Sequence, residues 1–300
     1  MDEKMRLIKL RPVLKEIIWG GNRLSEEYNL GSPGDKIAEA WMLCMSPEGE
    51  SVIEGGNLDG TLLSEAFGGY YAGMSVAFKL IDAASDLSVQ VHPSKTEMWY
   101  VLDCEPGARL VSGLSSGYDR EEFVKSAKDG TVGRYLRYVP VKKGDVFFIP
   151  RGLVHAIGGG ITLAEIQQNS NVTYRVYDYG RVGKDGRPRE LHLDAAADTV
   201  TDISPSETDA ARYSVSRGRI PGEEKLIADC EYFRVRERTV PEGGTARLRP
   251  DGKFLSVICV GGEGRISRRI IKKGDSFLLP KGCVATVRAD CDLRLILTDQ

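Results

Sequence analysis

The chain has 300 residues, of which 41% are hydrophobic and 28% charged, with a formal net charge of −2 at pH 7. These values are typical of a soluble globular protein with one large domain or two ordinary ones, and they exclude a general attraction to nucleic acid or to an anionic membrane. No stretch approaches the ~20 apolar residues of a membrane span, and the charged N-terminus lacks the apolar core of a signal peptide. An anionic substrate would therefore need a local basic pocket.

Short segments rich in β-branched and aromatic residues follow one another along the chain and are bounded by Gly, Pro, Asp or Ser. The 34 glycines and 13 prolines indicate many tight turns. Few segments have helical features. In chain order we expect a helix at 61–67, strands at 75–81, 87–91 and 98–102, a helix at 119–127 with a further turn at 133–138, strands at 146–149, 161–166 and 173–179, and a helix at 192–200. This pattern predicts an all-β protein, a sandwich or barrel with a few helices.

An internal repeat divides the chain. Residues 142–155 read KKGDVFFIPRGLVH and residues 272–285 read KKGDSFLLPKGCVA. In both, Gly-Asp begins a strand and Pro-x-Gly provides the turn out of it. We therefore expect two related β-modules: a first domain at 1–218, with a small helical insert at about 115–140, and a smaller second domain at 219–300.

Four polar residues of the first module have the spacing of a metal site. Gln90 and His92 lie two apart and so share one strand face, and Glu97 follows after a turn. His155 follows the Pro-x-Gly turn at the end of another strand. This mixed set of nitrogen and oxygen ligands suits one Zn²⁺, with Fe²⁺, Co²⁺ or Mn²⁺ as possible substitutes.

The second module offers an internal comparison for these four residues. Its frame ends in Ala285 where the first ends in His155. An alignment of His92-Pro93 with Arg249-Pro250 places Arg247 opposite Gln90 and Phe254 opposite Glu97. Because the second module keeps the turns and lacks the ligands, we expect the four residues to serve chemistry, and the second module to be a degenerate copy without metal.

We expect structural roles for the remaining histidine and the six cysteines. His192, in RELHLDAA, is expected at a helix start. The six cysteines show no C-x-x-C pairing and several lie in apolar runs, which favours reduced thiols in a cytoplasmic protein.

The chain resembles a known family at this point. Gly144, Pro150-x-Gly152 and His155 look like the second cupin motif, and His92 with Glu97 looks like the first. The Gln-x-His variant inside LSVQVHPSKTEMWYVL is similar to type I mannose-6-phosphate isomerases of the short bacterial and archaeal branch. The resemblance continues through residues 77–83, 139–161, 164–181 and 187–196. It implies two cupin-type jelly-roll barrels, a bicupin.

The resemblance also implies a reaction. Members of this family interconvert mannose 6-phosphate and fructose 6-phosphate, moving a proton between C1 and C2 through a cis-enediol. Such a reaction needs an electrophile for the developing oxyanion, an acid or base at the carbon, and an anchor for the phosphate. A redox-inert ion such as Zn²⁺ fits the first requirement.

By the same resemblance, Lys79, Ser88 and Lys95 line the substrate cavity and Arg175 lies across it. Strand alternation independently places Ser88 on the face of the metal ligands. For Lys79, the residues alone favour an outer-wall lysine, whereas the resemblance favours the cavity.

The catalytic residues implied are Lys95, Glu165 and Arg175. Lys95 and Glu165 are the candidates for proton transfer, although Glu165 could instead only orient Arg175. Trp41 lies in AEAW, where relatives often read GESW. This departure favours a barrel-wall role for Trp41.

Two other function classes stay open on the sequence. One is a metal-dependent cupin enzyme acting on another sugar or small molecule. The other is a non-enzymatic sugar-binding bicupin. The sequence also leaves open whether the chain is a monomer or a homodimer.

Overall fold

The computed structural model describes residues 7–68, 74–115, 117–183, 185–210, 212–214 and 224–300. Strands dominate these residues, which confirms the expected all-β class. No helix within the described ranges is long and apolar enough to cross a membrane. The predicted boundary between residues 218 and 219 lies outside the described residues, so the two-domain division stays a proposal.

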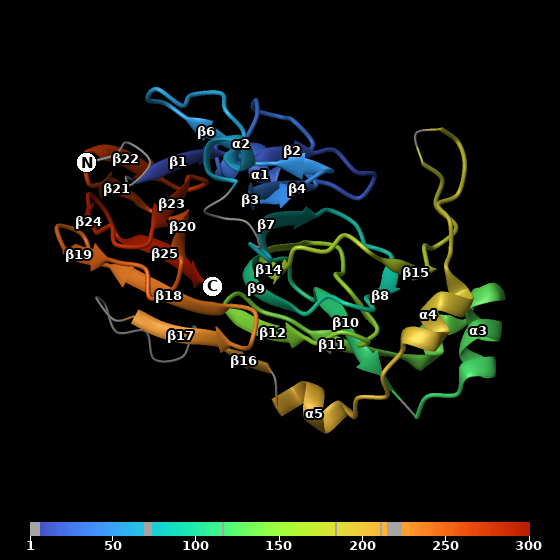
Figure 1. Cartoon of the computed structure of the whole chain (residues 1–300). Helices are drawn as coiled ribbons and strands as arrows, with labels where there is room; N and C mark the ends of the chain where they lie inside the picture. Colours follow the sequence, from blue (N-terminus) through green and yellow to red (C-terminus); the bar gives the residue numbers. More distant parts are fainter. Residues whose placement is uncertain (1–6, 69–73, 116, 184, 211, 215–223) are drawn as a thin grey trace.

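The first module contains a seven-stranded and a five-stranded sheet (Figure 1). The seven-stranded sheet has the order β16-β12-β9-β14-β7-β3-β2. These strands are β16 (Arg212–Ser214), β12 (Asp145–Ile149), β9 (Glu97–Cys104), β14 (Ile161–Gln168), β7 (Val76–Ala83), β3 (Glu39–Leu43) and β2 (Val13–Lys15). The five-stranded sheet consists of β11 (Leu136–Pro140), β10 (Arg109–Leu114), β13 (His155–Ala156), β8 (Val89–Val91) and β15 (Tyr174–Tyr177), in that order.

The second module contains a seven-stranded and a four-stranded sheet. The larger sheet runs β17 (Glu224–Asp229), β18 (Arg234–Val240), β25 (Leu293–Asp299), β20 (Phe254–Gly261), β23 (Ser276–Pro280), β1 (Ile8–Arg11) and β6 (Val52–Glu54). The smaller runs β19 (Thr245–Leu248), β24 (Ala285–Ala289), β21 (Glu263–Ile266) and β22 (Arg269–Lys272). A separate hairpin joins β4 (Met45–Ser46) and β5 (Gly49–Glu50).

The helices are short. They are α1 (Arg23–Glu27), α2 (Leu63–Phe67), α3 (Arg120–Lys128), the 3-10 helix η2 (Val132–Tyr135), α4 (Leu193–Thr199) and α5 (Pro205–Ala210). The helices expected at 61–67, 119–127 and 192–200 are confirmed, whereas α1 and α5 were not predicted. The turn expected at 133–138 is only partly right, because η2 ends at Tyr135 and β11 begins at the next residue. Asp119 caps α3 by accepting a hydrogen bond from the Glu122 amide at 2.8 Å. Helices α3 and α4 lie together at the end of the first module that is remote from the second (Figure 1).

The two modules share one strand-pairing scheme, which confirms the repeat as a pair of cupin-type barrels. In the first, β12 pairs with β9, β9 with β14, and β14 with β7. In the second, β23 pairs with β20, β20 with β25, and β25 with β18. Each module also receives a strand from outside its central sequence, because β1 pairs with β23 and β16 pairs with β12.

Side-chain alternation separates the barrel interior from the contact between the modules. In β9, Met98 and Tyr100 belong to a large apolar cluster that also includes Phe254 and Ile296 of the second module. Trp99, between them, belongs to an apolar cluster of the first module. Because successive strand residues point to opposite faces, the same strand joins the modules on one side and presents Glu97 and Trp99 to the barrel interior on the other.

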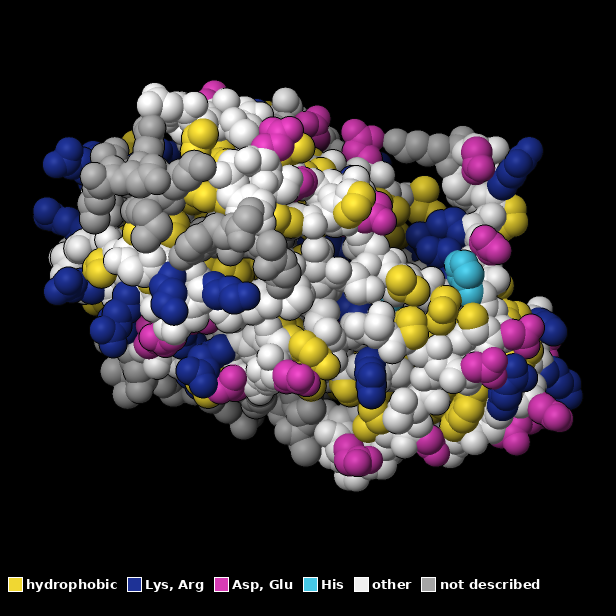
Figure 2. Space-filling model, viewed as in Figure 1, with side chains coloured by type: hydrophobic (Ala, Val, Ile, Leu, Met, Phe, Trp, Pro, Cys, Tyr) yellow, Lys and Arg dark blue, Asp and Glu magenta, His cyan; other side chains and the backbone are white. Residues whose placement is uncertain are grey.

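Basic and acidic side chains are both spread over the face shown in Figure 2, with hydrophobic side chains between them. This distribution agrees with a net charge near zero.

Candidate metal centre and substrate cavity

Three side chains that could ligate a metal converge inside the first barrel. His92, Glu97 and His155 offer ligand atoms that all lie within 4.8 Å of one another. Each of these residues is about 1% exposed. They come from the end of β8, the start of β9 and the start of β13.

Local structure fixes the place of each of these residues. A single residue pair joins β13 and β8 and sets His155 directly opposite Gln90. Opposed residues of antiparallel strands point to the same face. Gly152 donates its amide hydrogen to the His92 carbonyl at 2.9 Å, so the Pro-x-Gly turn is tied to the end of β8. Gly152 has φ of 81°, a left-handed conformation that favours glycine.

Both imidazoles are oriented by a backbone carbonyl. The Nδ1 atom of His92 lies 2.9 Å from the Val172 carbonyl oxygen, and Nδ1 of His155 lies 2.8 Å from the Leu153 carbonyl oxygen. A carbonyl can only accept, so each Nδ1 carries the hydrogen and each Nε2 has a free lone pair. This is the tautomer that a metal ligand needs.

Burial keeps the imidazoles neutral. It lowers the pKa of His155 to about 3, helped by the neighbouring His92. Burial also lowers the pKa of His92 and outweighs the opposing effect of Glu97. For Glu97, burial acts to raise the pKa, but Lys95 and His92 hold it well below the usual value. Two neutral imidazoles and a carboxylate are the protonation states that bind a divalent ion.

The unsatisfied atoms of the cluster fit a cation. Nε2 of both histidines and Oε1 of Glu97 are buried without a hydrogen-bond partner within the described residues. Nε2 of His92 lies 3.0 Å from Oε1 of Glu97, and with Nδ1 protonated both atoms are acceptors. Lys95 Nζ lies 2.6 Å from the same oxygen, a close ion pair that lacks hydrogen-bond geometry. Buried acceptors that face one another are costly unless a positive charge lies between them.

Gln90, Ser88 and Arg175 line the wall beside the cluster. Gln90 is opposite His155 in one direction and opposite Arg175 of β15 in the other. The Nε atom of Arg175 donates to the Ser88 hydroxyl at 3.3 Å. Burial, and then the charges of Arg189 and Arg181, lower the pKa of Arg175. Ser88, Gln90 and Arg175, which the sequence analysis assigned to one site, are therefore neighbours in the structure.

Lys79 lies inside the barrel and not on its outer wall. It is 7% exposed, and its Nζ lies 3.5 Å from Glu39 and 3.7 Å from Glu165. Burial would lower the pKa of Lys79, but Glu39 and Glu165 outweigh it and raise the pKa. Lys79 is thus a buried cation that lies between two carboxylates.

Trp41 is more than a wall residue. Its indole nitrogen donates to Glu39 at 2.7 Å, and Lys79 Nζ lies 4.8 Å from the centre of its ring. The AEAW segment therefore contributes Glu39 and Trp41 to the surroundings of Lys79, which the sequence interpretation did not anticipate.

Of the two candidates for proton transfer, Lys95 contacts Glu97 directly, whereas Glu165 is linked to Glu97 through the Trp99 indole. Burial and the charge of Glu97 raise the pKa of Glu165 to about 7. Its Oε2 accepts a hydrogen bond from the indole of Trp99 at 2.9 Å. Lys95 donates to Oε1 of Gln167 at 3.1 Å, in addition to its contact with Glu97. These two contacts restrain the Lys95 ammonium beside the Glu97 carboxylate.

His192 and the cysteines have the expected structural places. His192 is the N-cap residue of α4, and its Nδ1 accepts a hydrogen bond from the Arg175 amide at 3.2 Å. No disulfide joins any of the six cysteines within the described residues.

Strand register corrects the alignment of the two modules by one residue. Gln90 lies opposite His155, and the matching pair of the second module is Leu248 opposite Ala285. Leu248, and not Arg247, therefore occupies the place of Gln90. The sequence alignment was anchored on prolines, which lie in a turn where no pairing fixes the register.

The same correction holds at the position of Glu97. Glu97 lies opposite Ile149. Leu279 holds the same position in the repeat as Ile149, and it lies opposite Leu255. Leu255, and not Phe254, therefore matches Glu97. Pro250 follows Leu248 by two residues, as His92 follows Gln90. Pro250 therefore matches His92, whereas the sequence alignment had placed Arg249 there. Leu248, Leu255 and Ala285 are buried in one apolar cluster. The second barrel therefore has hydrocarbon side chains at the positions that match Gln90, Glu97 and His155.

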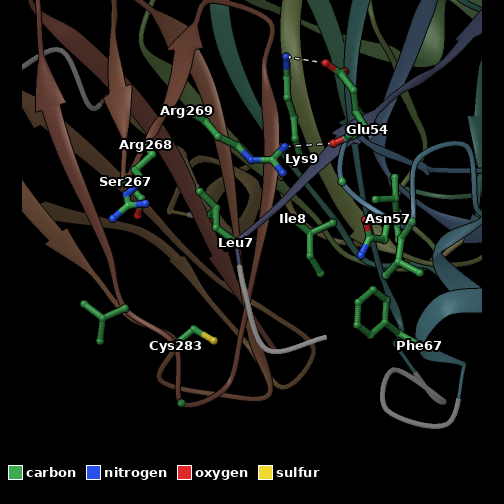
Figure 3. A pocket seen from close by; sticks show the side chains of 16 residues that line it. Leu7, Ile8, Lys9, Glu54, Asn57, Phe67, Ser267, Arg268, Arg269 and Cys283 are labelled. Atoms are coloured by element: carbon green, nitrogen blue, oxygen red, sulfur yellow. Dashed lines mark hydrogen bonds and ion pairs between the residues drawn. The ribbon is translucent and has the colours of Figure 1, made fainter. Parts of the chain in front are cut away.

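A cavity of about 660 Å³ lies away from these residues, between β1, β6 and the 267–269 turn (Figure 3). Arg269 donates to the Glu54 carbonyl at 3.0 Å, and Lys9 forms an ion pair with the Glu54 carboxylate at 3.0 Å. Much of the remaining lining is apolar and includes Leu7, Ile8, Phe67 and Cys283. None of the predicted site residues lines this cavity.

The sequence did not single out Glu39, Trp99 and Gln167. The available signal was alternation: Trp99 shares a strand face with Glu97, and Gln167 shares one with Glu165. Glu39 could not be found this way, because it comes from a strand far away in the sequence.

Comparisons with known proteins agree with this geometry. The model of the catalytic domain of type I phosphomannose isomerase matches residues 7–107. A mannose-6-phosphate isomerase of Bacillus subtilis is 37% identical, over 91% of this chain and 92% of the relative. One of Streptococcus mutans is 32% identical, over 96% of each.

Solved structures give the same result. The crystal structure of the mannose 6-phosphate isomerase from Bacillus subtilis matches with a TM-score of 0.82 and 28% identity, over 98% of this chain and 99% of that one. A putative mannosephosphate isomerase from Archaeoglobus fulgidus matches with a TM-score of 0.75 at 18% identity, which supports the fold alone.

Proposed function

The chain belongs to the type I mannose-6-phosphate isomerase family, and from this premise we propose that it is a metal-dependent isomerase that interconverts mannose 6-phosphate and fructose 6-phosphate. The observation that carries the proposal is the buried cluster of His92, Glu97 and His155 inside the matched barrel. Among the described residues the acceptor atoms of the cluster have no hydrogen-bond partners, and the second barrel lacks a counterpart of the cluster.

We propose one Zn²⁺ per chain, held by Gln90, His92, Glu97 and His155. Two imidazoles, a carboxylate and an amide oxygen suit zinc and also accept other divalent metals. When bound, the ion supplies a positive charge that polarises the substrate's oxygens. The carbonyl contacts of both Nδ1 atoms support this set, because they hold the imidazole rings before any ion arrives.

The sugar phosphate is proposed to lie against Lys79, Ser88, Lys95 and Arg175. A phosphate dianion binds strongly to lysine and arginine in a cavity from which water is excluded. Lys79 is a buried cation, and Arg175 reaches the Ser88 hydroxyl across the wall of the cavity.

Lys95, Glu165 and Arg175 are the proposed catalytic residues. Isomerisation through a cis-enediol takes a proton from C2 of the aldose and returns one to C1. Glu165, whose pKa of about 7 lies near neutral pH, is suited to accept and return that proton. Lys95 would assist at the oxygen that gains charge, since its ammonium is held beside Glu97. Arg175 would fix the substrate across the cavity.

We also propose a cytoplasmic protein, because no disulfide joins its cysteines within the described residues, acting as a monomer or homodimer.

A coupled assay tests the proposed function. Purified protein is supplied with mannose 6-phosphate or with free mannose, before and after treatment with a chelator. We expect turnover of mannose 6-phosphate only, and its loss on chelation. Equal turnover of free mannose would contradict the phosphate pocket, and no turnover by metal-loaded protein would contradict an isomerase of this substrate.

A further inference from the structure

The indole of Trp99 lies between two functional carboxylates. Its N–H is directed at Oε2 of Glu97, at 3.1 Å, and at Oε2 of Glu165, at 2.9 Å. Trp99 is completely buried. One donor therefore serves both a proposed metal ligand and a proposed proton-transfer residue.

The strands dictate this position. Glu97 and Trp99 are two residues apart in β9 and so share its interior face. Glu165 of β14 lies directly opposite Trp99, and directly opposed side chains are close enough to interact. The Trp99 ring also packs edge-on against His155, with 5.4 Å between ring centres.

The other oxygen of each carboxylate faces the proposed chemistry. Oε1 of Glu97 faces Nε2 of His92 at 3.0 Å. Oε1 of Glu165 faces Nζ of Lys79 at 3.7 Å. Because the indole holds both Oε2 atoms, it determines that Glu97 presents its Oε1 to His92 and that Glu165 presents its Oε1 to Lys79.

The second barrel provides an internal comparison. Trp99 lies opposite Phe147 and Glu165. The residue in the matching position is Val257, which lies opposite Phe277 and Leu297. In the second barrel, Leu255 and Leu297 match the two carboxylates, and Val257 matches the indole. The donor is present in the barrel that has carboxylates to orient.

We propose that Trp99 is a positioning residue, whose single N–H orients Glu97 toward the metal and Glu165 toward the substrate and so links metal affinity to proton transfer. The inference rests on the proposed function. Partners that orient a ligand from behind typically contribute 10–100-fold to metal affinity. We expect a loss of about that size when the N–H is removed.

Metal affinity gives a readout independent of activity. Zn²⁺ binding is measured by competition with a chromophoric chelator in wild type, Trp99→Phe and a Trp19→Phe control. Trp19 is 3% exposed and belongs to the same apolar cluster as Trp99, so the control reports the packing lost with an indole. A further variant replaces Trp99 with benzothienylalanine, which keeps the ring shape and lacks the N–H.

We expect weaker Zn²⁺ binding in both Trp99 variants, by roughly 10–100-fold, and wild-type binding in Trp19→Phe. At saturating metal, kcat should remain roughly tenfold lower or more in the Trp99 variants while KM changes little, because Glu165 is no longer held in place. The absorption spectrum of bound Co²⁺ should change in both, since it reports the geometry of the ligands.

Wild-type Zn²⁺ affinity and kcat in the benzothienylalanine variant would overturn the inference even if Trp99→Phe fails to fold. Equal losses in Trp19→Phe and Trp99→Phe would assign the effect to packing and also overturn it. If wild type binds no divalent metal or does not turn over mannose 6-phosphate, the proposed function itself fails, which is a distinct result.

Discussion

The metal cluster contains groups that would be expensive to bury for structural reasons alone. Nε2 of His92, Nε2 of His155 and Oε1 of Glu97 lack hydrogen-bond partners within the described residues. Each buried unsatisfied polar group costs about 1–3 kcal/mol. A cation bound at the cluster would offset this cost, so metal binding should stabilise the folded state.

His155→Ala should abolish metal binding and isomerase activity without preventing folding. The matching place in the second barrel is filled by Ala285, which is completely buried in an apolar cluster, so the barrel accepts alanine there. Metal content by elemental analysis and circular dichroism check both parts. His192→Ala serves as control for metal content, because His192 is a helix cap. Bound metal and full activity in His155→Ala would contradict the assignment of this ligand.

Glu165→Gln should lower kcat by about 10²–10⁴-fold, the usual contribution of a general acid or base. Glutamine keeps an oxygen that can accept from Trp99, so metal affinity should change little. Steady-state kinetics with mannose 6-phosphate measure the effect, with Glu105→Gln as a control because the Glu105 side chain is 64% exposed. A kcat within threefold of wild type would exclude Glu165 from proton transfer.

Among the turns, the Pro-x-Gly turn before β13 depends on a glycine for two reasons. Gly152 has φ of 81°, and a Cβ there would lie 3.0 Å from the Thr199 carbonyl oxygen and closer still to the Thr201 side chain. Gly107 has the same φ of 81° but no neighbour within 4 Å of a Cβ. Substitution of Gly107 therefore measures the backbone strain alone, whereas substitution of Gly152 measures the strain together with the steric clash.

Gly152→Ala should therefore reduce the free energy of unfolding by about 2–4 kcal/mol, against about 1 kcal/mol for Gly107→Ala. It should also weaken Zn²⁺ binding, because the turn carries His155 to the cluster. Urea unfolding and chelator competition measure the two effects. Similar losses of stability in both variants would show that strain alone, and not the contact with residues 199–201, limits this position.

The loop after β15 is held by a buried carboxylate. Asp178 accepts a hydrogen bond from Nε of Arg189 at 2.8 Å and forms an ion pair with Arg181. Burial acts to raise the pKa of Asp178, but the bonds from Arg189 and Arg181 outweigh it and leave the pKa below 3.8. The stabilisation is thus present above pH 3.8 and is lost as the pH falls through the lower pKa of the folded state.

Asp178→Asn should lower the free energy of unfolding by about 2 kcal/mol at neutral pH. The difference from wild type should stay constant down to about pH 5 and shrink below about pH 4. Urea unfolding across this range measures it, with Asp194→Asn as control, because the Asp194 side chain is 80% exposed. A difference that persists unchanged at the acid end would show that the charge of Asp178 does not hold the loop.

Elements with strong local patterns could be predicted from the sequence, whereas pairings distant in the sequence could not. The segments expected at 75–81, 98–102 and 161–166 lie in β7, β9 and β14, because β-branched and aromatic residues recur there. Helix α1 was missed because its five residues carry too little periodicity to detect. Motif spacing singled out His92, Glu97 and His155, and the structure brings these three side chains together. The positions of Glu39 and Trp99 beside the site depend on strand register, which cannot be read from local sequence patterns.

At the scale of the whole molecule, one apolar cluster joins both barrels. Tyr100 of β9 also donates a hydrogen bond to Glu237 of β18 at 2.8 Å. Strand β1 adds to the sheet of the second module, a pairing across more than 260 residues that leaves no local trace in the sequence. The second barrel thus supports the first by packing and strand exchange.

The second barrel also keeps part of the site's electrostatic framework. By register, Arg236 and Glu224 match Lys79 and Glu39, and they form an ion pair at 2.7 Å. Leu297 stands where the first barrel has Glu165. The second barrel therefore retains an ion pair, between Arg236 and Glu224, and lacks the groups that would bind metal or transfer a proton.

The central claim is that one metal ion in the first barrel enables the isomerisation. The most direct test strips the purified protein with a chelator and returns Zn²⁺ in steps while the isomerisation of mannose 6-phosphate is followed. The account predicts no activity in the stripped protein and a linear recovery that ends at one ion per chain. Full activity without metal, or recovery that continues to a second ion per chain, would contradict it.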